Sequence, residues 1–271
     1  MLTRELRALL WLFAALALSA GVLLYLLSGN TDDTFSWTIK PSVTAAFLGG
    51  AYWAAFVLFA WSARQDLWVR ARPFVLPVSV IAILLLVATV MHDDKFHKDS
   101  VFGWFWIVAY IVVPPALAIA LWTQFREPAV AAPPPRPLPP ALRMVLVLEA
   151  LVLAGVGISL FVAPDTADSL WPWPLTPLTS QALGAWAVGT GTPMVLLAWA
   201  GRRATLTGAA VTSITLAALL SLALVRFSAH VDWSSAGAWI YAAFLAALGI
   251  LGAAALVLGR AEPAPDQRLV R

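Results

Sequence analysis

The sequence predicts an all-α membrane protein with eight transmembrane helices, arranged as two four-helix bundles that repeat in parallel orientation. Three observations favour this fold. The composition is 61% hydrophobic and 11% charged, whereas a soluble domain has about 25% charged residues. Eight apolar runs are long enough to cross a bilayer, and a proline-rich stretch separates them into two groups of four.

Each apolar run provides roughly the 20 residues that a helix needs to cross about 30 Å of hydrocarbon. The runs are Ala8–Leu27, Val43–Trp61, Phe74–Met91, Val101–Trp122, Met144–Val162, Gln181–Ala200, Ala204–Val225 and Ala236–Leu258. The first is longer than the apolar core of a signal peptide, so we expect a membrane anchor. Pro73 precedes the third run directly, which indicates a helix start.

Residues 123–141 contain seven prolines in nineteen positions. Proline lacks a backbone N–H and fixes φ, so this stretch is predicted to be an extended linker. The chain therefore divides into a first four-span repeat (residues 1–122), the linker (123–141), and a second four-span repeat with a tail (142–271).

The composition also excludes some chemistry. The chain has no cysteine, which excludes disulfides, thiolate metal ligands and cysteine nucleophiles. The net charge is +3, but the basic residues lie in short loops, where they set membrane topology. We therefore expect the lipid bilayer as a partner and no nucleic acid.

Loop charges predict the orientation of the spans. Every arginine except Arg226 falls on the face that also holds both termini and the linker. Because cytoplasmic loops carry an excess of Lys and Arg, that face is predicted to be cytoplasmic. All three histidines and most aspartates lie on the opposite, outer face. Arginine greatly outnumbers lysine, as in GC-rich bacterial genomes, so we expect a multi-pass protein of a bacterial inner membrane.

Short segments of the first half recur in the second half. Trp37–Pro41 matches Trp173–Pro177, and Thr44–Gly49 matches Thr179–Gly184. A His-x-Asp motif also occurs twice, at residues 97–99 and 230–232. An even number of spans per copy keeps both copies in one orientation, so the sequence predicts a parallel repeat.

These segments carry a resemblance to a known group of proteins. Trp37–Pro41 with Thr44–Gly49, together with Trp171–Thr179, resembles a group of multi-pass membrane proteins from GC-rich bacteria. The resemblance covers most of the chain and implies a tandem four-span membrane fold. It implies no activity.

The duplicated His-x-Asp motif is the clearest candidate site. If the two copies converge, His97, Asp99, His230 and Asp232 supply two imidazoles and two carboxylates, which suit a divalent transition metal. Alternatively, each Asp caps the helix that follows it and complements the helix dipole, while each His lies at the membrane interface. The cap interpretation is favoured, and the metal interpretation stays open.

A second set of residues is predicted to bind a ligand. Glu149 is the one ionisable residue well inside an apolar run, so it is a functional candidate, although a hydrogen-bonded structural role also fits. Trp37 and Trp173 belong to rigid aromatic segments near span ends, and Lys40 lies beside one of them. These three fit either the rim of an apolar site or anchors at the membrane interface.

Three functional hypotheses follow from these patterns. The first is a non-enzymatic protein that binds or moves a small apolar molecule or lipid between two pseudo-symmetric bundles. The second is a metal-dependent membrane enzyme that uses the outer His and Asp residues. The third is a structural subunit of a larger membrane complex. The short loops and the absence of catalytic motifs favour the first.

Overall fold

The computed structural model describes residues 1–128, 130, 137–167, 171–200 and 203–260. Eight of its helices are long and apolar enough to cross a membrane. They are α1 (Arg4–Gly21, continued by the π-helical η1, Val22–Leu26), α3 (Ser42–Ala63), α4 (Trp68–Met91), α5 (Val101–Arg126), α6 (Pro140–Val162), α8 (Pro177–Ala200), α9 (Leu206–Arg226) and α10 (Ala236–Arg260). The prediction of an all-helical fold with eight spans is confirmed.

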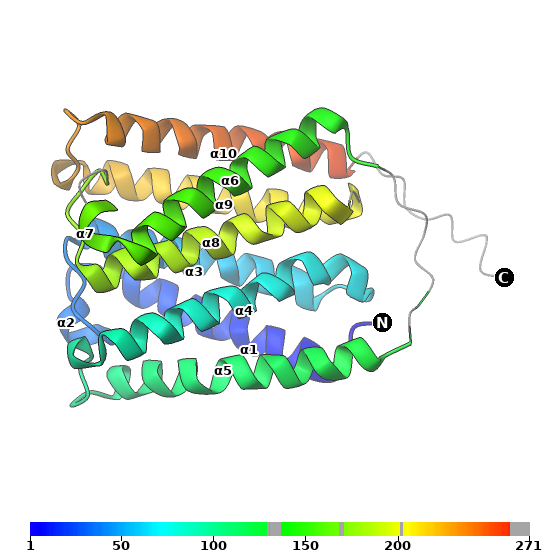
Figure 1. Ribbon diagram of the computed structural model, residues 1–271, viewed down its shortest axis with the longest axis horizontal. Coiled ribbons are helices and arrows are strands. Elements are labelled where there is room, and N and C mark those ends of the chain that lie inside the picture. Colours follow the sequence, from blue (N-terminus) through cyan, green and yellow to red (C-terminus); the bar gives the residue numbers. More distant parts are fainter. Residues whose placement is uncertain (129, 131–136, 168–170, 201–202, 261–271) are drawn as a thin grey trace.

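The long helices lie side by side, and their connections lie at two ends (Figure 1). Short α2 (Thr31–Thr34) and α7 (Pro164–Ala167) lie at one end, which we call the α2/α7 end. The chain begins at the opposite end, which we call the N-terminal end. The 3₁₀ turns η2 (Asp93–Lys95) and η5 (Ser228–His230) join α4 to α5 and α9 to α10. Because successive spans run in opposite directions, both turns lie at the α2/α7 end.

Helices from the two halves of the chain pack against each other. The α3 helix contacts α1 of its own half and α9 of the other half, while α8 contacts α6 and α4. The remaining close neighbours are α9 with α10 and α4 with α5. The halves therefore interlock through α3 with α9 and α8 with α4. The arrangement as two parallel-repeat bundles stays a prediction.

Small residues bring these helices close together. A Cβ atom at Gly49 of α3 would overlap the backbone of Tyr25 at the end of α1. A Cβ atom at Gly189 of α8 would overlap the side chain of Ile81 on α4. Membrane helices associate through such close packing because lipid tails are as apolar as the helix surfaces. Gly49 and Gly189 therefore allow the close contacts of α3 with the end of the first span and of α8 with α4.

Several helices begin earlier than the apolar runs predicted. The third span begins at Trp68 rather than Phe74, and Pro73 lies inside it rather than at its start. Pro140 and Pro177 are instead the first residues of α6 and α8, where a missing N–H costs nothing. Hydropathy marks the part of a helix inside hydrocarbon, whereas these helices continue beyond it.

Candidate functional site

A cavity of about 460 Å³ lies within the bundle. Its lining comes from α1, α3, α4 and α5 of the first half and from α8 and α9 of the second. The described residues that line it include no Asp, Glu, Lys, Arg or His. Ligand-binding pockets of proteins usually measure about 300–1,000 Å³ and are mostly apolar. Size and lining therefore suit a small apolar molecule.

Aromatic side chains form one wall of this cavity. The rings of Tyr52 on α3 and Trp186 on α8 meet edge to face, with centroids 4.8 Å apart. The Tyr110 and Trp106 rings on α5 lie 4.4 Å apart. The hydroxyl oxygens of Tyr52 and Tyr110 are 3.1 Å apart, within hydrogen-bonding distance. This hydroxyl pair is a polar group in a largely hydrocarbon lining.

The cavity reaches the outer surface of the bundle between α1 and α5. Ser19 on α1 and Phe105 on α5 both line the cavity and are both exposed, Phe105 to 57%. At the N-terminal end the same two helices are joined, because the buried Gln124 of α5 bonds to the residues before α1. The opening between them therefore lies further toward the α2/α7 end, where Ser36 and Phe102 also line the cavity.

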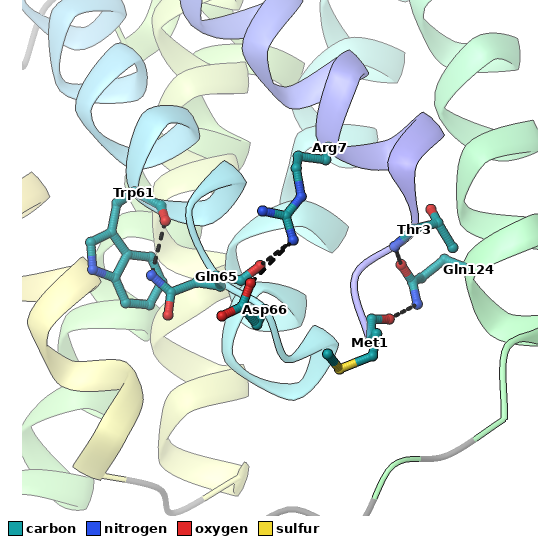
Figure 2. A network of polar contacts seen from close by, with 7 residues as sticks. All are labelled: Met1, Thr3, Arg7, Trp61, Gln65, Asp66 and Gln124. Carbon is teal, nitrogen blue, oxygen red and sulfur yellow. Dashed lines mark hydrogen bonds and ion pairs between the residues drawn. The ribbon is translucent and has the colours of Figure 1, made fainter. Parts of the chain in front are cut away.

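Figure 2 shows how Gln124 makes this join. Its Oε1 accepts a hydrogen bond from the Thr3 N–H at 2.9 Å, and its Nε2 donates to the Met1 carbonyl at 2.9 Å. Nearby, Arg7 of α1 donates to the Gln65 carbonyl and pairs with Asp66 at 3.4 Å, in the loop between α3 and α4. At the N-terminal end of the bundle, the start of α1 is thus fastened to the last turn of α5 and to the loop between α3 and α4.

Comparison of the chain with protein-family models, with curated proteins and with solved structures finds no match. The function must therefore be argued from the cavity and from the residues around it.

The four residues predicted to bind a ligand lie outside the cavity lining. Trp37 and Trp173 are each 2% exposed and belong to two aromatic clusters at the α2/α7 end. The Trp173 Nε1 donates to Thr44 Oγ1 at 2.8 Å, which ties this loop to α3. Lys40 is exposed, and Glu149 is half-buried on α6 with no hydrogen-bond partner for its Oε1 among the described residues.

The predicted metal ligands do not form one cluster. Among the described residues, no group of three or more His, Cys, Asp or Glu side chains is placed to hold a metal ion. The His97 ring nitrogens lie 3.2 Å from Thr38 Oγ1 and 3.2 Å from the Phe35 carbonyl, so neighbours already engage both. The His230 ring packs against Phe227. A shared metal site stays a prediction without an assembled ligand set.

Helix capping at the motif differs from the favoured interpretation. Ser100, not Asp99, is the N-cap of α5, and its Oγ accepts from the Gly103 N–H at 3.1 Å. Ser235 fills the corresponding place before α10, where its Oγ accepts from the Ala238 N–H at 3.3 Å. Serine lies closer in sequence to the free N–H groups of the first turn, so its short side chain reaches them. The prediction that the two aspartates cap these helices is wrong.

Asp232 instead organises its own loop. Its Oδ1 accepts a hydrogen bond from the Ser234 N–H at 3.1 Å and another from the Ser234 hydroxyl. These bonds stabilise the charged form and hold the pKa of the Asp232 carboxyl below its ordinary value. The carboxylate is therefore ionised at neutral pH.

The loops before α5 and α10 make the same hydrogen bonds at equivalent positions. The His97 N–H donates to the Ser36 carbonyl, and the Asp232 N–H donates to the Pro172 carbonyl, both at 2.9 Å. Two further pairs of bonds have the same spacing along the chain. The Ser100 Oγ donates to the His97 carbonyl, as the Ser235 Oγ donates to the Asp232 carbonyl. The Trp104 Nε1 donates to the Lys98 carbonyl, as the Trp239 Nε1 donates to the Trp233 carbonyl. In this pattern His97 corresponds to Asp232 rather than to His230.

Sequence reasoning did not single out Tyr52, Tyr110 or Trp186. Each lies in an apolar run in which aromatic residues are common. Tyr52 and Tyr110 are 58 positions apart, and nothing in their spacing shows that they meet. A tyrosine well inside a span has a hydroxyl that needs a partner, and this is the one signal that would have identified Tyr52 and Tyr110.

Proposed function

We propose that this integral membrane protein binds a small apolar molecule or lipid in the cavity between its two halves. One observation carries the proposal: the cavity of about 460 Å³ is bordered by no charged side chain among the described residues, and it opens between α1 and α5. Its occupant enters from the bilayer, because an apolar molecule dissolves there rather than in water.

The chemistry of the lining supports an apolar occupant. Water is a poor filling, because a buried water needs two to four polar partners and this lining offers few. An apolar molecule restores the missing contacts without such partners.

Photo-cross-linking tests this proposal directly. The protein is reconstituted into bilayers with a hexadecane that carries a diazirine, irradiated and digested, and the labelled residues are mapped by mass spectrometry. We expect adducts on buried cavity residues such as Ala55 and Met194, besides those on lipid-facing positions. Adducts confined to lipid-facing positions such as Ile119 would contradict binding in the cavity.

A pair of variants provides the control for this experiment. Ala55→Phe places a ring in the cavity and should remove the adducts from the other buried lining residues. Ala118→Phe makes the same change on the exposed surface of α5 and should leave them unchanged. Equal labelling of the lining in both variants would show that the label does not report the cavity.

We propose further that the N-terminal end faces the cytoplasm of a bacterial cell, because arginines such as Arg4, Arg64 and Arg70 gather there. The absence of cysteine from the chain makes the test simple. In intact cells, a membrane-impermeant maleimide should label Asp33→Cys at the α2/α7 end and leave Asp66→Cys unlabelled. The reverse labelling would invert the topology.

We also infer that the two halves are copies of one four-span unit. The hydrogen bonds that recur before α5 and α10 support a duplication. The reciprocal contacts of α3 with α9 and of α8 with α4 support a two-fold relation along the membrane normal. In this view the cavity lies beside the pseudo-symmetry axis, on the side of the first half.

A further inference from the structure

The hydroxyl pair of Tyr52 and Tyr110 is the most distinctive chemical feature of the cavity. Both residues line it, and they come from different helices, α3 and α5. Their oxygens lie 3.1 Å apart, and either oxygen can be the donor. Neither hydroxyl has another hydrogen-bond partner among the described residues.

The pair leaves one hydroxyl hydrogen unused. Two hydroxyls carry two hydrogens, and the bond between them needs only one. The lining around the pair is mostly apolar and offers few other polar atoms. A buried hydroxyl hydrogen without an acceptor is unfavourable, so an occupant with an oxygen atom is favoured over a pure hydrocarbon.

The lining limits which oxygen-containing group the occupant can carry. No charged residue borders the cavity among the described residues, and moving an unpaired charge into an apolar site is very costly. Carboxylates and phosphates are therefore excluded from the Tyr52–Tyr110 region. The Trp106 Nε1 is already bonded to Thr89 Oγ1 at 2.9 Å, so it does not compete for the ligand. An uncharged hydroxyl or carbonyl oxygen remains.

We propose that the cavity selects an apolar molecule with a single uncharged oxygen function, an alcohol or a ketone, which is held by the hydroxyls of Tyr52 and Tyr110. The inference rests on the proposed binding of an apolar molecule and specifies its chemical class. The aromatic rings of Trp186 and Trp106 pack beside the two tyrosines and hold them toward each other. The hydrocarbon part of the ligand then fills the space along α4 and α9.

The test is a competition against the diazirine probe with two molecules that differ by one oxygen, hexadecan-1-ol and hexadecane. For each molecule, the concentration that halves the labelling of Ala55 and Met194 is measured in the wild type and in the Tyr52→Phe/Tyr110→Phe variant. The ratio of the two molecules within one protein is compared between proteins, because their partition into the bilayer then cancels. A net hydrogen bond of ordinary strength corresponds to a factor of about 2–12.

We expect the preference for the alcohol over the alkane to fall by that factor in the double variant, while hexadecane still competes. Tyr241→Phe is the matched control, because its hydroxyl is buried with no hydrogen-bond partner among the described residues, and Tyr241 is not part of the cavity lining. It should retain the preference of the wild type. If the double variant is not monodisperse, the single variants Tyr52→Phe and Tyr110→Phe replace it.

Two results would overturn the inference, and they differ in meaning. An unchanged preference in the double variant, with both molecules competing, shows that the tyrosine pair only ties α3 to α5, while the proposed binding survives. Failure of both molecules to compete at the lining residues of the wild type removes the proposed binding itself and the inference with it.

Discussion

Gln124 is predicted to be the main fastening between α1 and α5, and Gln124→Leu tests this. The substitution keeps the side chain close in size but removes both of its hydrogen bonds. It leaves the Thr3 N–H and the Met1 carbonyl without their partner. Because Gln124 itself is only 2% exposed, water does not replace the lost amide at its own position.

The expected loss follows from these two bonds. Each contributes about 0.5–1.5 kcal/mol net. Met1 is 56% exposed, so its carbonyl recovers water in the variant, and the penalty for an unpaired group is therefore small. We expect a loss of about 1–3 kcal/mol in the free energy of unfolding. At about 2–4 °C per kcal/mol for a chain of this size, the midpoint of thermal unfolding should fall by about 2–12 °C.

Tryptophan fluorescence during heating in detergent measures this midpoint. Gln65→Leu is the matched control, since Gln65 lies at the same end and, among the described residues, its side chain bonds only the Trp61 carbonyl near the end of α3. Its midpoint should change by less than that of Gln124→Leu. An equal or larger shift in the control would refute the view that Gln124 fastens α1 to α5.

Three further outcomes are expected. Gly189→Leu should prevent α8 from packing on α4 and abolish monodisperse elution, whereas Gly155→Leu, with open space beside it, should elute as the wild type does. The lowered pKa of Asp232 means that its ionised form stabilises the fold at neutral pH and that this contribution is lost as the pH falls through the folded-state pKa, below the ordinary aspartate range. Between pH 7 and pH 3 the unfolding midpoint of Asp232→Asn should therefore fall less than that of the wild type. His97→Ala should lower the unfolding midpoint at pH 7 by the equivalent of about 1–2 kcal/mol. His230→Ala should lower it by a smaller amount, because the His97 ring, unlike the His230 ring, has hydrogen-bond partners among the described residues.

The spans could be predicted from the sequence because their cause is local. A segment in lipid has no water to satisfy its backbone, so it forms a helix whatever its neighbours do. Hydropathy alone therefore located all eight helices. Their ends depend on contacts outside the hydrocarbon, and these contacts explain the early start of α4 at Trp68 and the serine caps before α5 and α10.

The candidate site could not be predicted in the same way. The cavity lies between α1, α3, α4 and α5 of the first half and α8 and α9 of the second. Its shape depends on how helices distant in sequence pack, and no single segment encodes it. The predicted ligand-binding residues were chosen for their chemistry or their place in a motif. None of them lines the cavity: Glu149, Lys40, Trp37 and Trp173.

The recurring loops show why an identical motif can be a poor guide to equivalent positions. The sequence match pairs His97 with His230, whereas the hydrogen bonds pair His97 with Asp232. What recurs at this position is a backbone N–H that donates to the loop before α3 or α8. The side chain is free to differ there, and it does: the His97 ring faces Thr38 and the Phe35 carbonyl, whereas the Asp232 carboxylate binds Ser234. In the proposed duplication, a two-fold axis therefore brings a histidine opposite an aspartate and leaves His230 without an equivalent histidine. These hydrogen bonds favour a structural role for the duplicated motif and leave the apolar cavity as the proposed ligand site.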